Sequence, residues 1–368
     1  MTRAREDDAD NAAPERRTTL ADVAARAGVS RATASRALRG DRRISERTSA
    51  GVHDAAESLG YVPNLTARHL RSHRTHSLGL LLSDMADPDH GAVGAGFELV
   101  AAGTGYTVLI VAARKKSGDE RRALKVFQER GTDGVCIASS SLDPATAQSA
   151  IGAVPLIIVQ PDHPGIAAEV DRLPGGTIRT DDESGVRQAV LHLVSRGYRD
   201  IAYLGAGPRA TNSLRGSIAD RVLREETDQP MRAFQVADEA WRHPDVVAAA
   251  LGPVLPEAVV CYDDKLAIAL LDGLRARGVR VPDDVAVVGY DDIPFAAFSN
   301  PRLTTVATPA QEMVRLAART LIEVIATGKR PPPRILPVEL VVRESSTARS
   351  VEEMSGTVVH RDRPLETG

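Results

Sequence analysis

The chain of 368 residues has only two cysteines and no long apolar run. Cys136 and Cys261 cannot build a disulfide framework, and each lies in an apolar, strand-like stretch, which predicts two buried, inert thiols. No stretch approaches the ~18 apolar residues of a membrane-spanning helix. Residues 1–16 carry acids and lack an apolar core, so they predict a disordered tail and no secretory signal. We therefore expect a cytoplasmic protein with no membrane partner.

The sequence also lacks the motifs of common catalytic and cofactor sites. Gly205-Ala206-Gly207 follows an expected strand, but the third glycine of a dinucleotide-binding motif is missing. No Ser/His/Asp or Cys/His arrangement can be placed. The acidic pairs Asp181-Asp182, Asp263-Asp264 and Asp291-Asp292 fit either metal or acid–base chemistry or the capping of helices, and capping is the simpler interpretation. We expect no enzyme activity, no cofactor and no metal.

Charge is distributed unevenly along the chain. Residues 17–76 hold eleven Lys or Arg and five Asp or Glu, a net charge of +6, whereas residues 77–368 carry −7. A basic N-terminal region followed by an acidic remainder is typical of a nucleic-acid-binding module attached to a domain that avoids DNA. Chance clustering of arginine is the alternative, and it is weakened because the basic region coincides with a helical pattern.

That pattern predicts two short helices joined by a tight turn over residues 19–40. Apolar residues 20–27 have the spacing of one buried helical face, and Gly28 follows where a left-handed cap is needed. Ser30 is suited to cap the second helix, which turns Ala34, Ala37 and Leu38 inward. Its outward residues are Arg31, Ala32, Ser35, Arg36 and Arg39. Such side chains suit phosphates and guanine edges in a DNA major groove, although a solvated helix pair without a ligand is the alternative.

A third helix is predicted over residues 45–59, and a basic segment, LTARHLRSHRT, follows Asn64. Here the chain resembles the LacI/GalR family of bacterial transcription regulators, through TLADVAARAGVS, the pair Ser35-Arg36, ISERT, LGYVPN and the AxxL at Ala67 to Leu70. The resemblance implies a helix-turn-helix DNA-binding domain over residues 17–62, then a hinge helix and linker over 63–76. The DNA contacts that it implies are Thr19, Ser30, Arg31, Ala32, Ser35, Arg36, Arg39, Tyr61, Asn64, Ala67, Arg68 and Leu70.

The hinge suggests how such a protein engages DNA. Residues 64–71 are fewer than the ~12–15 that a lone helix needs in water, so we expect them to fold only when two copies meet on an operator. In the family, a leucine at the Leu70 position wedges between base pairs in the minor groove, and a core leucine of a linker helix is the alternative. The resemblance thus implies a homodimer on a pseudo-palindromic double-stranded operator.

From Ser77 onward, short apolar runs alternate with helical stretches, which predicts mostly parallel sheets covered on both faces. DGVCIA and RGVRVPDDVAVVGYDDIPFAAFSNPRLTTV resemble the family's effector domain, which looks like a periplasmic sugar-binding protein. We therefore expect an α/β effector-binding and dimerisation domain over residues 77–345. It would consist of two doubly wound parallel-sheet subdomains with crossovers near 180, 306 and 338, followed by a flexible tail over 346–368.

The resemblance also places an effector site between the subdomains, beyond the ends of the strands. The residues that it implies are Arg215, Asp291, Tyr262, Gln160 and His90. Several depart from the family's pattern: Tyr262 stands for an asparagine and Gln160 for an aspartate, and Asp89-His90 replaces two stacking aromatics. We expect a small polar effector that stacks less than a typical sugar, and a pocket that binds nothing is the alternative. Trp241, the only tryptophan, fits the cleft or ordinary packing equally well.

These features predict a homodimeric repressor whose operator affinity is controlled by a small-molecule effector. A solute-binding protein without a DNA role would share the body, but it would be expected to have an export signal and no basic N-terminal region. An α/β enzyme would need a catalytic arrangement that we do not find.

Overall fold

The computed structural model describes residues 18–62, 74–85, 88–113, 117–162 and 176–347. The chain divides into two compact units, and the boundary along the sequence lies between Thr75 and His76. The predicted tail over residues 1–16, the predicted hinge over 64–71 and all but the first two residues of the predicted tail over 346–368 lie outside the described residues. Each unit is described separately below.

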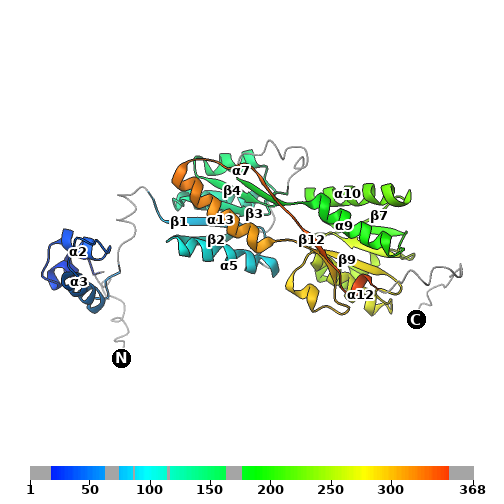
Figure 1. The fold of residues 1–368 in the computed structure, drawn as a ribbon, viewed down its shortest axis with the longest axis horizontal. Coiled ribbons are helices and arrows are strands. Elements are labelled where there is room, and N and C mark those ends of the chain that lie inside the picture. Colours follow the sequence, from blue (N-terminus) through cyan, green and yellow to red (C-terminus); the bar gives the residue numbers. More distant parts are fainter. Residues whose placement is uncertain (1–17, 63–73, 86–87, 114–116, 163–175, 348–368) are drawn as a thin grey trace, which may run out of the picture. The chain divides into compact units, whose positions relative to one another are not determined.

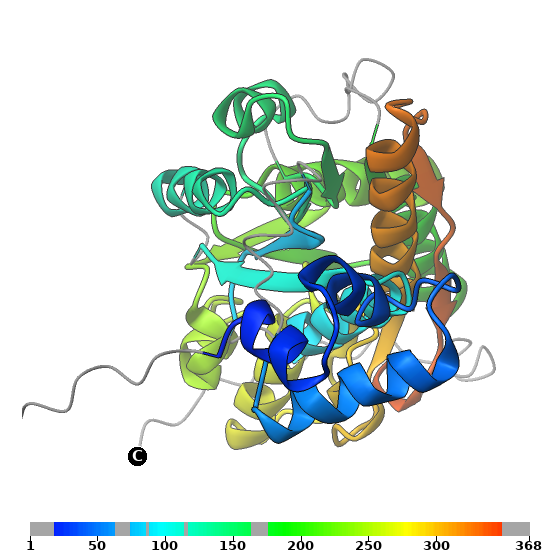
Figure 2. The ribbon, with the colours of Figure 1, turned by 90° about the vertical axis from the view of Figure 1, so that its left-hand side faces the viewer.

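The described residues of the first unit form the helices α1 (Leu20–Arg26), α2 (Arg31–Ala37) and α3 (Glu46–Ser58), coloured blue in Figures 1 and 2. Each begins with a hydroxyl cap, because Thr19, Ser30 and Ser45 accept hydrogen bonds from backbone N–H groups in the first turn. Gly28 ends the first helix at a φ of +65°, a conformation that suits glycine. The helices pack around a small core that includes Val23, Ala24, Ala34, Ala37, Val52, Ala55 and Ala56.

The second unit contains two six-stranded sheets, and the first has the strand order β11-β5-β4-β3-β1-β2 with all pairs parallel. Its strands are β1 (Ser77–Leu82), β2 (Thr107–Ala112), β3 (Gly134–Ala138), β4 (Leu156–Val159), β5 (Thr177–Thr180) and β11 (Arg334–Leu336). One face packs against α5 (Pro88–Gly103) and α13 (Ala310–Thr327), and the other against α6 (Ser117–Glu129) and α7 (Pro144–Ile151). Apolar cores lie on both faces, as expected for a parallel sheet.

The second sheet has the order β12-β10-β9-β8-β6-β7, with only the β10–β12 pair antiparallel. Its strands are β6 (Ile201–Ala206), β7 (Arg232–Val236), β8 (Ala258–Cys261), β9 (Ala286–Asp291), β10 (Thr304–Ala307) and β12 (Glu339–Val341). Its helices are α9 (Asp182–Ser195), α10 (Ala210–Thr227), α11 (Pro244–Ala249) and α12 (Asp264–Ala276), with 3-10 turns η2 (Ala240–Arg242), η3 (Pro294–Ala297) and η4 (Glu344–Ser346). The elements share one large apolar core.

The chain passes between the two sheets at three points: from β5 to α9, from β10 to α13 and from β11 to β12 (Figure 1). The described fold thus confirms the predicted class, an α/β body of two parallel-sheet subdomains with a helix-turn-helix unit. No described helix is long and apolar enough to cross a membrane. Both cysteines are buried, and burial raises the pKa of each thiol.

A fully buried acid, Asp264, ties helix α12 to strand β10 and to the segment after β9. Its carboxylate accepts hydrogen bonds from the Ile293 backbone N–H, at 2.9 Å, and from the Thr305 hydroxyl. Its oxygen lies where a Cβ on Gly289 would collide with it, so glycine is required there. Burial raises the pKa of Asp264 from 3.8 to about 8.

This raised pKa predicts a pH-dependent stability. Between about pH 4 and 8 the folded chain keeps a proton that the unfolded chain loses, so the free energy of unfolding falls as pH rises through that window, by at most about 1.4 kcal/mol per unit. We expect Asp264→Asn to flatten this slope in urea unfolding measured at pH 5 to 8. Asp181→Asn is the control, since Asp181 caps α9 and asparagine also caps a helix. An equally steep slope in Asp264→Asn would contradict the assignment.

Candidate functional site

The first candidate site is the exposed face of α2. Ser30 caps the helix, with its hydroxyl accepting from the Thr33 N–H at 3.0 Å. The side chains that the sequence predicts to face outward are exposed, except Ser35, which is half-buried; they are Arg31, Ala32, Arg36 and Arg39. Arg39 Nε donates to the Ser35 carbonyl at 2.9 Å. This face therefore presents exposed guanidinium groups, a feature of helices that enter a DNA major groove.

The other predicted DNA contacts differ in their exposure, and some lie outside the described residues. Thr19 is exposed and forms a capping box with Asp22. Tyr61 is half-buried and packs against the core of the first unit, so its ring also has a structural role. Asn64, Ala67, Arg68 and Leu70 lie outside the described residues.

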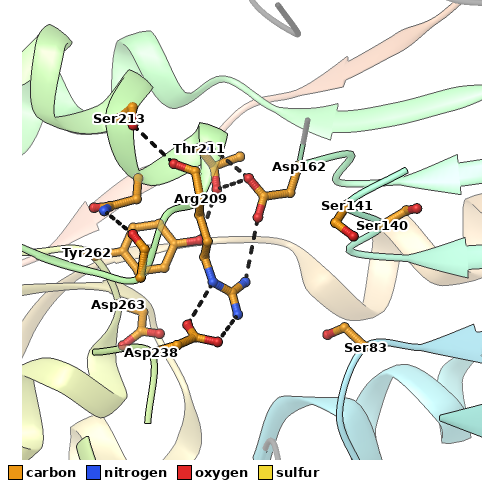
Figure 3. Close-up of polar contacts among 12 residues, drawn as sticks. Ser83, Ser140, Ser141, Asp162, Arg209, Thr211, Ser213, Asp238, Tyr262 and Asp263 are labelled. Carbon is orange, nitrogen blue, oxygen red and sulfur yellow. Dashed lines mark hydrogen bonds and ion pairs between the residues drawn. The ribbon is translucent and has the colours of Figure 1, made fainter. Parts of the chain in front are cut away.

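The second candidate site is a cavity of about 130 Å³ in the second unit, lined by residues from both sheets. The five predicted effector residues, His90, Gln160, Arg215, Tyr262 and Asp291, all line it. Figure 3 shows part of this site, with Asp162 and Ser83 from the first subdomain facing Thr211, Arg209 and Tyr262 from the second. The structure thus brings together residues that are up to about two hundred positions apart in sequence.

Arg215 is the most deeply buried cation of the cavity. Its Nε donates to Asp182 Oδ1 at 3.0 Å, and its Nη1 donates to the Tyr262 carbonyl at 2.9 Å. The guanidinium carbon lies 3.6 Å from the centre of the Tyr290 ring, whose hydroxyl donates to Asp182 at 3.0 Å. Burial acts to lower the pKa of Arg215, but Asp182 and the neighbouring rings and acids raise it well above the usual value. Arg215 is therefore charged, and it holds the second subdomain together as well as facing the cavity.

Two other predicted residues, Gln160 and His90, make polar contacts within the first subdomain. Gln160 Nε2 donates to the Thr180 hydroxyl at 2.9 Å, and its Oε1 accepts from the Thr180 N–H at 3.0 Å. His90 is 7% exposed, and its Nδ1 contacts the Asp84 carbonyl. Its Nε2 lies 3.5 Å from the Ser83 hydroxyl. Both side chains shape the wall of the cavity, and His90 supplies no large aromatic face there.

The sequence did not point to the strongest contacts across the cavity. Asp162 Oδ1 accepts from the Thr211 N–H at 2.8 Å and from its hydroxyl at 2.9 Å, and the same hydroxyl lies 2.9 Å from Tyr262 Oη (Figure 3). Arg209 Nη1 lies 3.7 Å from Asp162 Oδ2, while its Nε and Nη2 donate to Asp238. The available signal was position alone, because Asp162 and Thr211 follow strand ends, where ligands of α/β sheets bind.

Backbone strain is concentrated around the same cavity. Ser139, Gln160 and Asp291, which all line it, have φ angles of +60°, +48° and +111°. Non-glycine residues rarely adopt such angles, and positions of this kind cluster at functional sites. The strain is therefore located at the strand ends that form the cavity wall.

Two of the acidic pairs contain residues whose carboxylates cap helices. Asp181 accepts from the Ser184 N–H at 3.1 Å, and Asp263 from the Leu266 N–H at 2.9 Å, so both are caps. The glycines of the incomplete dinucleotide motif contact side chains instead: a Cβ on Gly205 would collide with Asn212 and Gln235. Trp241 is partly buried, packs against the core of the second subdomain and stacks with Arg242.

Comparison with known proteins identifies the family. Residues 19–64 match the family described as bacterial regulatory proteins, lacI family, and residues 190–346 match the periplasmic binding protein-like domain. The transcriptional regulator DegA of Bacillus subtilis is 30% identical over 343 residues, which cover 90% of this chain and 98% of DegA. This chain belongs to the lacI family of bacterial regulatory proteins. CelR of Thermobifida fusca, another regulator, is 32% identical, over 90% of this chain and 98% of CelR.

Solved structures agree with the assignment of this lacI-family regulator. A lac repressor dimer bound to its operator and an anti-inducer superposes with a TM-score of 0.79 at 26% identity, covering 90% of this chain and 100% of that one. A CelR–cellobiose complex gives a TM-score of 0.64 at 29% identity, over 89% and 100%. The predicted family, fold and regulatory function are thereby confirmed, while the roles of individual site residues stay predictions.

Proposed function

We propose that this regulator is a cytoplasmic, homodimeric repressor whose two helix-turn-helix units bind a pseudo-palindromic operator. The observation that carries the proposal is the presence, in one chain, of an exposed arginine face on α2 and a polar cavity between two subdomains. The lac repressor structure, a dimer on its operator, supports the same arrangement here. A solute-binding protein would share the cavity but would not need the residues that match the lacI model.

The proposed functional domains follow the sequence-based boundaries. Residues 17–62 contact the major groove, residues 63–76 form the hinge, and residues 77–345 bind the effector and the second copy. The hinge folds between two operator-bound copies, with Leu70 inserted in the minor groove, and such bending of DNA costs on the order of 1–6 kcal/mol, offset by added contacts. Effector binding alters how the two first subdomains of the dimer face each other, and therefore the separation of the hinges.

Exposed apolar side chains support dimerisation through both subdomains. Leu99 on α5 is 62% exposed, and Ile110 on the edge strand β2 is 41% exposed. In the second subdomain, Phe295 on η3 and the adjacent Phe298 are 55% and 83% exposed. Large exposed apolar groups of this kind mark protein interfaces. The C-terminal sequence has no leucine heptads, so we expect dimers and no coiled-coil tetramers.

The dimer is testable by sedimentation velocity of the full chain. We expect a single dimer species, and we expect Phe298→Glu to weaken dimerisation by at least about tenfold, because a charge would be buried in the interface. Val254→Glu is a matched control, since Val254 is 70% exposed but precedes β8, at the opposite end of the sheet from η3. A stable tetramer, or a monomer that binds one half-site tightly, would overturn this part of the proposal.

The effector is proposed to be a small polar molecule and not a plain hexose. His90 lines the cavity where a stacking ring would add apolar contact to a sugar face, and Tyr262 is engaged with Thr211. A thermal-shift screen of the full chain should therefore find its best ligand outside the unmodified hexoses, and that ligand should change operator affinity. Micromolar binding of a plain hexose would refute this specificity while leaving operator binding untouched.

A further inference from the structure

The start of helix α10 is capped from the opposite side of the cavity. Arg209 stands at the N-cap position and makes no side-chain cap. The Asp162 carboxylate takes this role, with the Thr211 N–H and hydroxyl donating to it at 2.8 and 2.9 Å. Amides at a helix start attract negative charge. Asp162 therefore fills a position that an anionic oxygen favours.

The donors around this carboxylate are held in place without it. Arg209 forms a fork with Asp238, at 3.0 Å from Nε and 3.2 Å from Nη2, which leaves Nη1 directed toward Asp162. The Thr211 hydroxyl is also 2.9 Å from Tyr262 Oη. These donors and their partners all belong to the second subdomain (Figure 3); they are Arg209, Asp238, Thr211 and Tyr262. If Asp162 withdraws, a preorganised set of donors is left without an acceptor.

Asp162 itself belongs to the first subdomain. Its backbone N–H donates to the Ser140 carbonyl at 2.7 Å, and its side chain is 10% exposed. A second cation lines the same cavity: the Arg215 side chain is 6% exposed and is held by Asp182 and the Tyr262 carbonyl. The wall of the second subdomain therefore carries two cations, Arg209 and Arg215, beside the position that Asp162 occupies.

The size of the cavity limits what can enter while Asp162 stays in place. Its volume of about 130 Å³ is below the ~300–1,000 Å³ of small-molecule sites. A ligand that bonds to Thr211 must displace the Asp162 side chain, which already bonds to it. The ligand must also satisfy the donors that this side chain leaves behind.

We infer that Asp162 is an internal competitor for the effector, and that the effector is a small hydroxycarboxylic acid whose carboxylate replaces Asp162 on Thr211 and Arg209. This inference rests on the proposed effector cavity and names the ligand class for it. Exchange of one carboxylate for another conserves the charge beside Arg209. The ligand's hydroxyls then face Ser83, Ser139 and Thr180 on the opposite wall.

The test compares D-glycerate with glycerol, which share a three-carbon chain and differ mainly in the carboxylate. Asp162→Asn keeps the shape of the competitor but removes its charge. We expect this variant to bind D-glycerate about tenfold more tightly than the unmodified chain, with glycerol binding unchanged, because charge-assisted hydrogen bonds are the stronger ones. Calorimetry or ligand-observed NMR on the full-length dimer measures both affinities.

Two further variants separate local competition from general electrostatics. Asp263→Asn also removes one carboxylate from the cavity wall, and it should raise D-glycerate affinity by less than about threefold, because the charge lies outside the Thr211–Arg209 donor set. Adding Arg209→Gln to Asp162→Asn should abolish the gain. Equal gains in both single variants, a matching gain for glycerol, or no D-glycerate binding to Asp162→Asn would overturn the inference. Operator binding measured in parallel shows whether the regulator itself remains functional.

Discussion

Substitution of Arg36 by alanine is expected to remove specific operator binding while largely preserving binding to random DNA. Arg36 is exposed on the outer face of α2, one turn after Arg31 and Ala32 at the start of the helix. A bidentate arginine–guanine contact discriminates between bases by ~1–3 kcal/mol, and a dimer contains two copies, so the loss is about 2–6 kcal/mol. Non-specific binding rests on phosphate contacts and should keep most of its salt dependence.

The measurement is a pair of titrations, on a selected operator and on random DNA, at two salt concentrations. Arg47→Ala is the matched control, because Arg47 is also exposed but lies on α3. Any loss in that variant should be equal on both DNAs. Equal losses on both DNAs for Arg36→Ala would show that Arg36 contacts only phosphate.

Substitution of Arg215 by methionine is expected to destabilise the second subdomain strongly. Arg215 and Asp182 form an ion pair at 3.0 Å with side chains only 6% and 5% exposed. Removing one partner of a buried pair leaves an uncompensated charge and typically costs about 3–5 kcal/mol. Because the chain has a single tryptophan, Trp241, which packs against this core, urea unfolding can be followed by its fluorescence.

A second substitution tests the cause of this loss. In the double variant Arg215→Met with Asp182→Asn, the buried charge is absent, so most of the lost stability should return. Arg224→Met is the control, because its ion pair with Asp220 is 55% and 39% exposed and such surface pairs contribute ~0–1 kcal/mol. If Arg215→Met costs no more than Arg224→Met, the buried pair is not important for stability. Ligand and operator binding by Arg215 variants must be measured well below their unfolding transitions.

The sequence was most informative where secondary structure is determined by residues that are adjacent along the chain. The N-terminal helices have local caps and a local apolar face, so Ser30 and Ser45 marked the starts of α2 and α3 correctly. The strands of four or more apolar residues were also visible, because they are buried on both faces.

Other strands could not be predicted because their identity depends on tertiary pairing. β5 (TIRT) and β10 (TTVA) are half threonine and lie where the chain passes between sheets. β7 (RAFQV) is an edge strand that alternates between partly buried and exposed residues. β11 and β12 are three residues each. Segments this short have no usable periodicity of their own.

The candidate effector site was likewise predicted from the sequence only in part. The family resemblance led to five residues that line the cavity, but it did not reveal that Gln160 and Arg215 are held by internal bonds. Asp162 and Thr211 are 49 positions apart, and no local pattern connects them. Their contact arises only when the two subdomains are brought together, so it could be found only in the folded chain.

The central claim, that this chain is a sequence-specific, dimeric DNA-binding regulator, is tested most directly by sequencing the DNA that it selects. Purified full-length protein is mixed with fragmented genomic DNA, and the retained fragments are sequenced, with Arg36→Ala as a parallel sample. We expect enrichment of a pseudo-palindrome with two related half-sites, as two-fold symmetry requires, and loss of that enrichment in the variant. Retained DNA that matches the input, or that contains only isolated half-sites, would contradict the account.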